Sequence, residues 1–446
     1  MPKKIKVEYV RKGFDISEGI ELPRNITHHR VDDSHLFIAP EKAAWITTGN
    51  LGKDIIHYFQ DGYSIEKVMK ELTLKGIKKE TIISELRRLL IDIEKNGFLA
   101  NAIVKDGEVN DINLHLYLTN KCNLRCRHCY MDSGLPLQNE LSTEDFISVI
   151  DQFAAISKNQ VILTGGEPLL FPDIQVLIKQ AKEKGLKVSI FTNGTLIDEK
   201  FVSQIEDYVD EIQFSLDGAS SEVNDSIRGK GVFQRVLKTA DLLKKTNIKL
   251  RLAMVIMPQN VEDLKTNIIG LARRLDGVEM KLSFALKAGR SNQTYRFASS
   301  AVAENELQVI LTSLYQNRLK AMTKIEPNLI IKNCGYGEVI TISSNGDIYP
   351  CALLINKAGN LKKNNFRDIV DKIRADTKAS NVENYKECST CDLKYICFGG
   401  CRLNNIIHNK SLFKVYCPPG KKEDYYRLLV RRSKFDALGI WLGCNN

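Results

Sequence analysis

Cys122-Asn-Leu-Arg-Cys126-Arg-His-Cys129 carries the strongest structural signal in the chain. This CxxxCxxC loop directly follows an apolar run, Asn113 to Thr119, that is typical of a strand. Three thiolates on one short loop can hold three irons of a [4Fe–4S] cube and leave the fourth iron without a protein ligand. Taken alone, the loop also allows a zinc knuckle of Cys126, His128 and Cys129, with Cys122 idle.

The region around this loop alternates strand runs with helices. The expected strands are 113–119, 160–163, 187–191, 211–216, 249–255 and 279–284. Ser142 is a good N-cap for the helix that begins at Thr143, and each crossover is long enough for parallel strand pairing. Eight such units would close a full barrel, so six predict an α/β fold with a partial (β/α)6 TIM-like barrel. Its site is expected at the C-terminal ends of the strands.

Three polar turns stand where these strands end. Thr164-Gly165-Gly166-Glu167-Pro168 follows the second strand, Thr192-Asn193-Gly194 the third, and Ser215-Leu216-Asp217-Gly218 the fourth. Glycine lets the backbone approach a ligand closely, and Glu167 offers a carboxylate to an ammonium group. Asn193-Gly194 and Asp217-Gly218, taken singly, are also ordinary turn sequences.

A second set of cysteines lies near the C-terminal end. It consists of Cys334, then Gly346 with four residues before Cys351, then Cys388-x2-Cys391-x5-Cys397-x3-Cys401, and finally Cys417. A zinc ribbon needs four ligands and predicts neither the glycine spacing nor the solitary Cys417. No apolar run approaches the roughly 18 residues of a membrane helix, and MPKKIKVEYV is not a signal peptide. We therefore expect a cytoplasmic protein in which ten of the eleven cysteines are metal ligands rather than disulfide partners, and Cys444 is an unpaired thiol near the end of the sequence.

The first loop, with His128 at the Φ position of CxxxCxΦC, and the GGEP turn resemble the radical S-adenosylmethionine (SAM) superfamily. The resemblance implies that Cys122, Cys126 and Cys129 hold a [4Fe–4S] cluster whose open iron is chelated by SAM. Cleavage of SAM then gives methionine and a 5′-deoxyadenosyl radical. The SAM contacts that the resemblance implies are Gly165, Gly166, Glu167, Ser215, Arg228 and, near the ribose, Ser189 or Asn193.

The C-terminal set resembles the complete seven-cysteine SPASM pattern. This resemblance implies two auxiliary [4Fe–4S] clusters, for three in all, and a one-electron donor such as flavodoxin or ferredoxin. Cys388, Cys391, Cys397 and Cys417 would hold the second auxiliary cluster, which leaves Cys334, Cys351 and Cys401 for the first. Residues 335–340 supply no fourth cysteine, so that iron is either open to substrate or capped by Cys444 or a nearby carboxylate.

Residues 36–100 form a compact unit ahead of the barrel. Helices are expected from Leu51 to about residue 61, after Ser64, and from Glu80 to Asn96, so the unit is predicted to be a winged-helix fold. It resembles the PqqD-like recognition element of peptide-modifying enzymes, in which an edge strand or groove near Phe37 and Trp45 would accept a leader by strand addition. A winged helix and a net charge of +10 also suit DNA, but no helix dense in arginine and asparagine is present.

The predicted domains are 1–104 for peptide recognition, 105–325 for the barrel, 326–420 for SPASM and 421–446 for a helix and tail. The whole resembles sactionine synthases, which implies that a precursor peptide is bound through its leader and that cysteine sulfur is joined to carbon; the catalytic base stays unknown. Alternatives are ranthipeptide-type thioethers, carbon–carbon crosslinks and sulfatase-maturing oxidation. The sulfatase-maturing branch typically has an aspartate directly after the second SPASM cysteine, and this chain has Ala352 there, which argues against that oxidation. A non-catalytic zinc or redox protein that binds nucleic acid is the alternative from another class.

Overall fold

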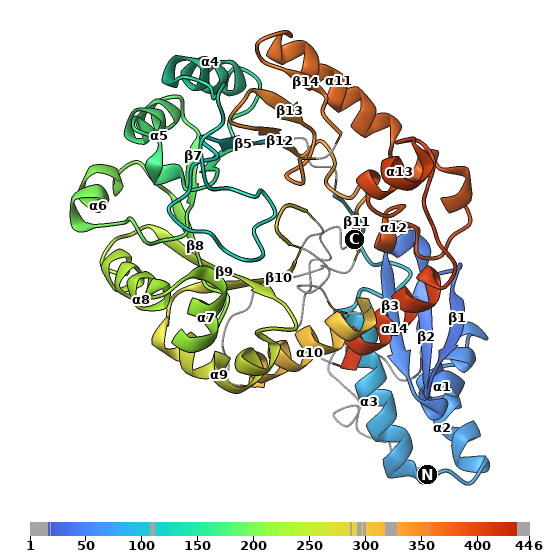
Figure 1. Cartoon of the computed structure of the whole chain (residues 1–446). Coiled ribbons are helices and arrows are strands. Elements are labelled where there is room, and N and C mark those ends of the chain that lie inside the picture. Colours follow the sequence, from blue (N-terminus) through green and yellow to red (C-terminus); the bar gives the residue numbers. More distant parts are fainter. Residues whose placement is uncertain are drawn as a thin grey trace.

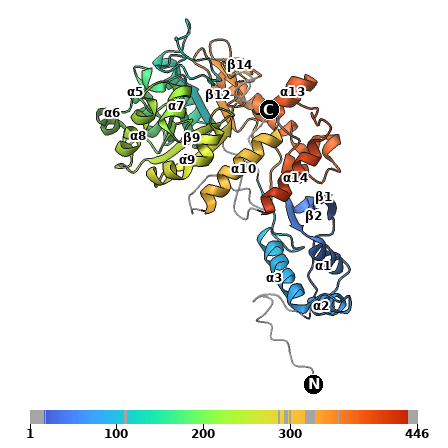
Figure 2. The same ribbon diagram turned by 60° about the horizontal axis from the view of Figure 1, so that its bottom comes forward.

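The computed structural model describes residues 17, 19–107, 112–285, 288–291, 297, 300–316, 328–354 and 356–434. A front domain, an open barrel and a cysteine-rich segment follow one another along the chain (Figure 1). Figures 1 and 2 place the front domain beyond the cysteine-rich segment, away from the barrel helices α5 (Ile174–Glu183) and α6 (Glu199–Ile205).

The front domain begins with a three-stranded antiparallel sheet and continues with three helices. Its elements are β1 (Thr27–Val31), β2 (Ser34–Ala39), β3 (Ala44–Thr48), α1 (Asn50–Gln60), α2 (Ile65–Leu74) and α3 (Lys79–Lys95). The three expected helices are present, and the Ser64 side chain caps α2 by accepting from Lys67 N at 3.3 Å. The predicted winged helix is not confirmed, because a complete sheet in the order β1-β2-β3 precedes all three helices.

Strand β2 is buried on both faces, which explains its unbroken apolar run. Phe37 points into a core shared with α1, α2 and α3. Leu36 and Ile38, which point the opposite way because side chains alternate along a strand, pack with Leu429 of α14 (Lys421–Lys434). The front domain is therefore joined through its sheet to the C-terminal helix.

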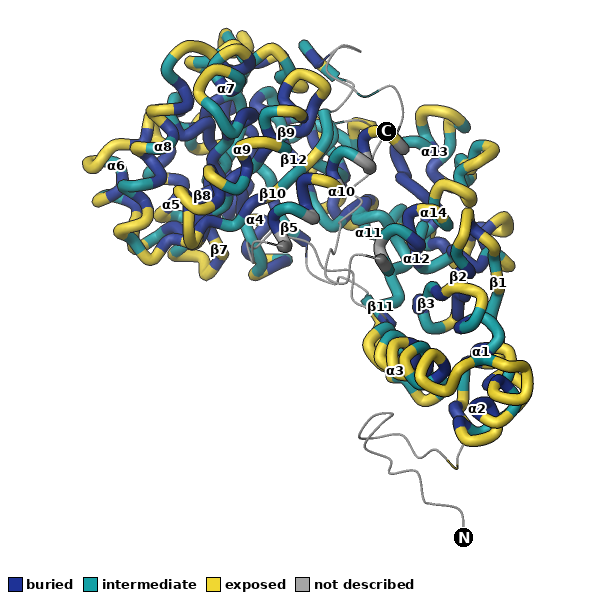
Figure 3. The backbone as a smooth tube through the Cα atoms, turned by 90° about the horizontal axis from the view of Figure 1, so that it is seen from below, coloured by how far each residue is buried: buried dark blue, intermediate teal, exposed yellow. Residues whose placement is uncertain are grey.

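The barrel has the six parallel strands that the sequence predicts. They are β5 (Asn113–Tyr117), β6 (Gln160–Thr164), β7 (Lys187–Phe191), β8 (Glu211–Ser215), β9 (Lys249–Ile256) and β10 (Glu279–Phe284), paired in chain order. The outer layer contains α4 (Thr143–Ala154), α5, α6, α7 (Ser221–Arg228), α8 (Val232–Leu243), α9 (Val261–Arg274) and α10 (Ser300–Gln316). Figure 3 shows that the outer turns of α3 and α6 are exposed, whereas the barrel strands are largely buried.

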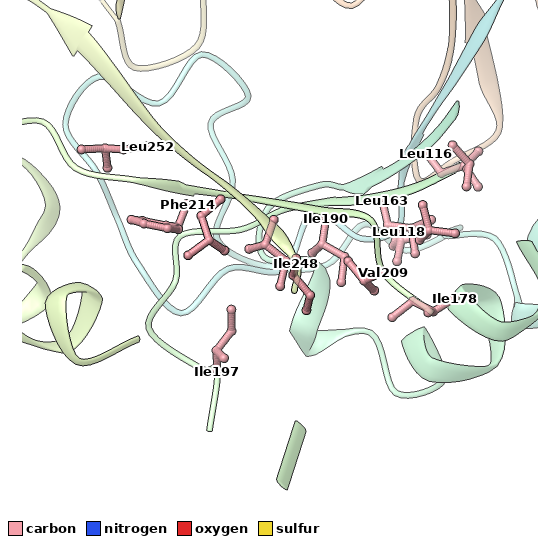
Figure 4. Close-up of a cluster of buried hydrophobic side chains, with 14 of the residues drawn as sticks. Leu116, Leu118, Leu163, Ile178, Ile190, Ile197, Val209, Phe214, Ile248 and Leu252 are labelled. Carbon is pink, nitrogen blue, oxygen red and sulfur yellow. The ribbon is translucent and has the colours of Figure 1, made fainter. Parts of the chain in front are cut away.

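Alternation along each strand separates the hydrophobic core from the lumen. Leu116, Leu163, Ile190, Phe214 and Leu252, from five consecutive strands, belong to one cluster that packs against the outer helices (Figure 4). The intervening positions include polar residues such as Ser189, Gln213 and Arg251, which therefore face the lumen.

The cysteine-rich segment extends the barrel sheet rather than forming a separate body. Strand β12 (Val339–Ile342) pairs in parallel with β5 and is followed by β13 (Asp347–Tyr349) and β14 (Gly359–Asn360), which completes a nine-stranded sheet. The short β4 (Lys105–Asp106) pairs with β11 (Leu329–Ile330). The segment also contains α11 (Phe366–Ala379), α12 (Lys394–Cys397) and α13 (Arg402–Asn409). The predicted boundary near residue 326 is thus crossed by strand pairing.

A fully buried arginine organises the loops of this segment. Arg402 donates to the carbonyl oxygens of Ser380 (2.8 Å), Phe398 (2.7 Å), Gly400 (2.8 Å) and Lys332 (3.3 Å). Its guanidinium also lies 5.0 Å from the centre of the Tyr385 ring. One side chain therefore satisfies carbonyl groups from several segments that have no regular secondary structure of their own.

Replacing Arg402 with leucine is expected to lower the free energy of unfolding by about 3 kcal/mol or more, because several buried carbonyls lose their donor. Urea unfolding of the anaerobically purified protein, followed by tryptophan fluorescence, measures this loss. Arg427→Gln is the control, since Arg427 is half-exposed and pairs only with Asp424 of its own helix among the interactions described. Equal midpoints for the Arg402 and Arg427 variants would contradict the role of Arg402.

Candidate functional site

The loop that carries Cys122, Cys126 and Cys129 follows β5 and is held by backbone hydrogen bonds at both ends. Cys122 N donates to Gly134 O at 3.0 Å, and Arg127 N donates to Ile227 O at 3.1 Å. Arg290, which sequence analysis did not identify, donates from Nε to the carbonyl of Cys126 at 2.9 Å. The loop geometry is therefore fixed by groups other than the three thiols.

The three thiols are free and partly buried. Burial raises the pKa of Cys126 to about 11, and burial also raises the pKa of Cys122. Thiols in such surroundings become thiolates when a bound cation compensates the charge. The donor set therefore fits a metal cluster with exclusively thiolate ligands from the protein.

The buried carboxylate of Asp217 contacts His128 of this loop. His128 Nε2 lies 3.1 Å from Asp217 Oδ2, and Arg228 Nε lies 2.6 Å from the same oxygen. Burial would raise the pKa of Asp217, but Arg228 and His128 outweigh burial and hold that pKa below its usual value. Asp217, seen in the sequence only as a turn residue, is thus a fully buried partner of the loop.

Gly165 and Gly166 of the GGEP turn lie so close to the backbone that follows β5 that there is no room for a Cβ atom. Gly165 has a φ of +146°, and a Cβ there would lie 2.5 Å from Thr119 O; at Gly166 it would lie 2.4 Å from Lys121 O. Gly166 N donates to Thr119 O at 2.7 Å and Glu167 N donates to Lys121 O at 2.8 Å. The structure thus gives a structural reason for both glycines beside the predicted ligand contact.

Glu167 is fully buried and accepts three hydrogen bonds. The donors are Thr192 Oγ1 (2.7 Å), Asn193 N (2.8 Å) and Leu169 N (3.2 Å). Burial raises the pKa of Glu167 to about 7, and these hydrogen bonds oppose the rise. The carboxylate therefore ties the GGEP turn to the loop after β7, while its contact with an ammonium group stays a prediction.

The remaining predicted SAM contacts differ in burial and in whether they lie near the cysteine loop. Asn193 donates to Asn123 Oδ1 at 2.8 Å, and its Nδ2 lies 4.0 Å from Cys122 Sγ. Ser215 is half-buried at the end of β8. Ser189 is fully buried in mid-strand and accepts from Gln160, so the structure does not bring it to the cysteine loop. Arg228 reaches the loop, with its Nε facing Asp217.

The structure brings the second cysteine set together as two groups. Burial raises the pKa of Cys388 to about 11, and the neighbouring Cys391, Cys397 and Cys417 raise it further. Cys334, Cys351 and Cys401 share another cluster with Tyr336, Leu403 and Leu412. Among the described side chains, no set of three or more Cys, His, Asp or Glu has the spacing for a single metal ion.

Glu338 is a carboxylate in the segment after Cys334, and it fits the nearby carboxylate that the sequence allowed as a cap without naming the residue. A turn in which Glu338 N donates to Gly335 O at 3.2 Å brings it back toward Cys334. Burial raises the pKa of Glu338, and Cys334 adds to the rise. The Glu338 side chain is half-buried. Burial raises the pKa of Cys351, and Glu338 adds to that rise, so the carboxylate lies near two thiols of this group. Cys444, the other candidate cap, lies outside the described residues.

Two phenols connect the first cysteine loop with the second cysteine set. The hydroxyl groups of Tyr117 and Tyr130 lie 2.7 Å apart, and Tyr117 donates to the carbonyl of Ala352 at 3.5 Å. Tyr130 follows Cys129 and Ala352 follows Cys351. The pair had no sequence signal, because its members are ordinary tyrosines until the fold joins them.

The front domain contains a cavity of about 820 Å³ between β3 and α3. Its lining includes Thr47, Thr48, Ser84, Glu85 and Arg88. Arg88 donates to Thr48 Oγ1 at 2.8 Å and to Glu85 Oε1 at 2.6 Å. Of the two residues near which an edge strand or groove was expected, Phe37 is fully buried, whereas Trp45 belongs to the edge strand β3 and packs against the cluster that contains residues of α14.

Family models match two parts of the chain. The radical SAM superfamily matches residues 116–268, and the SPASM iron–sulfur cluster-binding domain matches residues 334–392. The described residues include no helix both long and apolar enough to span a membrane.

Similar proteins have several activities. An AdoMet-dependent heme synthase of Methanosarcina barkeri is 29% identical, over 68% of this chain and 96% of that protein. The antilisterial bacteriocin subtilosin biosynthesis protein AlbA of Bacillus subtilis is 28% identical, over 69% of this chain and 70% of its own length. Streptococcus suis SuiB bound to S-adenosylmethionine has a similar fold, with a TM-score of 0.56 and 18% identity, over 89% of this chain and 99% of SuiB.

Both family matches agree with the positions of the cysteines. The radical SAM match includes the cysteine loop at the barrel mouth, and the SPASM match begins at Cys334 and includes part of the two further cysteine groups. The chain therefore contains a radical SAM domain, matched over residues 116–268, and a C-terminal SPASM iron–sulfur cluster-binding domain, matched over residues 334–392.

Proposed function

We propose that the enzyme modifies a ribosomally made precursor peptide by joining cysteine sulfur to carbon. The observation that carries this proposal is the front domain, whose edge strand β3 borders a groove that an extended peptide can enter. The similarity to the subtilosin protein supports a peptide substrate, and one solved SuiB structure is bound to its precursor peptide SuiA. The heme synthase relatives show that the barrel type alone does not define the substrate.

The chain's residues divide the chemistry among three places. Cys122, Cys126 and Cys129 would hold the cluster that binds SAM, which when bound supplies a 5′-deoxyadenosyl radical for hydrogen abstraction. Asn193, Glu167 and Ser215 would orient SAM at the strand ends. The two C-terminal cysteine groups would hold auxiliary clusters, for three [4Fe–4S] clusters in all, and an external flavodoxin or ferredoxin would supply electrons.

Leader binding in the groove would keep the reactive part of the peptide near the barrel mouth. Among the described strands β3 pairs only with β2, so the backbone groups of its other edge are available to a peptide, and α3 contributes both signs of charge through Glu85 and Arg88. A bound strand would therefore gain main-chain hydrogen bonds from β3 and side-chain contacts from α3.

Glu338 would complete the first auxiliary site when no peptide is bound. Its half-buried carboxylate, which lies close enough to Cys334 and Cys351 to affect the electrostatics of both groups, favours a capped iron over one that is open to solvent. A carboxylate is a weaker cluster ligand than a thiolate, so a substrate cysteine could replace it.

Replacing Cys122, Cys126 and Cys129 together with alanine is expected to abolish SAM cleavage and to lower the iron content from about twelve to about eight per chain. The auxiliary cysteines are not touched by these changes. Measurement of 5′-deoxyadenosine after reduction with dithionite, together with iron analysis, tests both parts. Continued 5′-deoxyadenosine formation in this variant would refute the assignment.

The groove is tested by Ser84→Trp, which fills it without removing any interaction that the structure describes. The dissociation constant of a labelled leader, taken from a cysteine-containing precursor encoded beside the gene, is expected to rise about ten-fold or more. Fluorescence anisotropy measures binding, and SAM cleavage without peptide is expected to stay unchanged. Ser203→Trp on α6 is the control, and wild-type binding by the Ser84 variant would exclude the groove.

The cap is tested in the protein that lacks the first three cysteines, so that only auxiliary clusters are observed. In the Glu338→Gln variant, the electron paramagnetic resonance spectrum of the reduced clusters is expected to change when a small thiol is added, because an iron site has become accessible. Glu199→Gln, an exposed glutamate on α6, is the control. A spectrum that responds equally to thiol with and without Glu338 would show that Glu338 does not cap the cluster.

Mass spectrometry distinguishes the proposed product from the alternatives. A thioether removes two hydrogens for each crosslink and consumes a cysteine thiol, whereas a carbon–carbon crosslink leaves the thiols free for alkylation. Reaction of a cysteine-free peptide would favour the carbon–carbon alternative.

A further inference from the structure

Asp392, the residue after Cys391, is a buried carboxylate shared by three parts of the chain. Its Oδ2 accepts from Thr27 Oγ1 at 3.0 Å and lies 2.6 Å from His29 Nε2, and both of these partners belong to β1. The Tyr426 hydroxyl of α14 donates to Oδ1 at 3.0 Å and lies 3.1 Å from Oδ2. Asp392 itself is only 7% exposed.

Hydrophobic packing surrounds this polar centre. His29 stacks on Tyr426 with 4.1 Å between ring centroids. Val31, Leu36 and Ile38 of the front sheet form one buried cluster with residues of α12 and α14, and Trp45, Cys391 and Cys397 pack against it. Figure 2 shows α14 lying beside β1 and β2. Two of the four cysteines assigned to the second auxiliary cluster therefore border the front domain.

The contact between Asp392 and the front domain stabilises the buried carboxylate. A buried carboxylate is costly unless hydrogen bonds replace its water, and the front domain supplies two of the three side chains that bond to Asp392. Without β1, Asp392 would lose both of them, and the apolar surface beside Cys391 and Cys397 would face solvent. Groups that surround cluster ligands control solvent access and ligand orientation.

We infer that the front domain is a wall of the second auxiliary cluster site, and that Asp392 is the positioning residue that fixes Cys391 between β1 and α14. This inference rests on the proposed assignment of Cys388, Cys391, Cys397 and Cys417 to one cluster. The front domain then has two tasks on two surfaces: the groove at β3 and α3 receives the peptide, and the face with β1 shields the cluster. Removing the domain would disturb the cluster as well as peptide binding.

The experiment uses the full chain with Cys122, Cys126 and Cys129 replaced by alanine, so that iron and spectra report on the auxiliary clusters alone. Thr27→Val removes one donor to Asp392 with little change in shape. His29→Phe keeps the ring stack without the donor, and His29→Gln keeps a donor without the ring. The matched control is Thr143→Val, which removes a threonine–aspartate hydrogen bond of 2.7 Å to Asp173 in the barrel.

Loss of iron to a chelator and the electron paramagnetic resonance spectrum of the reduced clusters are measured. Thr27→Val and His29→Phe are expected to lose iron from one cluster about ten-fold faster and to alter its spectrum, with His29→Gln closer to the parent. Thr143→Val is expected to match the parent. Parent-like rates and spectra in Thr27→Val and His29→Phe would overturn the inference while leaving the cluster assignment intact. A parent protein without auxiliary iron would overturn both.

Discussion

Parallel pairing between β5 and β12 is the contact on which the rest of the structure depends. Leu114 pairs with Ile340 and Leu116 with Ile342, so the first strand of the barrel has a neighbour on both sides. β5 leads into the loop of Cys122, and β12 is flanked in sequence by Cys334 and Cys351. Backbone hydrogen bonds thus fix the relative position of the SAM-binding loop and the auxiliary cysteines, and Tyr117 spans the space between them.

Most of the barrel and the cysteine sites could be predicted because their signals are local. Alternating apolar residues place the strands within one or two positions of the observed ones, and the cysteine spacings are short enough to define loops. The sheet of the front domain was harder to predict from the sequence. The apolar runs at 36–38 and 44–46 correspond to β2 and β3, but strand β1 reads Thr-His-His-Arg-Val, which lacks an apolar alternation, so a three-stranded sheet could not be deduced.

Asp217 and Asp392 were missed because partners such as His128 and Thr27 are distant in sequence. Asp217 looks like a turn residue until Arg228 and His128 meet it in the core. Asp392 and Thr27 are 365 positions apart. Glu338 belongs to a segment in which a cysteine ligand was sought, and a carboxylate has no motif of its own. Such residues are found only when burial and unpaired polar groups can be evaluated in three dimensions.

The packing of α14 on the front sheet also has a consequence for the order of events during synthesis. The front domain has its own core around Phe37 and Leu86 and can begin to fold as it leaves the ribosome. The opposite face of its sheet, with Leu36 and Ile38, stays uncovered until residues 421–434 have been made. Cys391 and Cys397, which pack against the same cluster, are made before these residues, so they are enclosed only after residues 421–434 have been made.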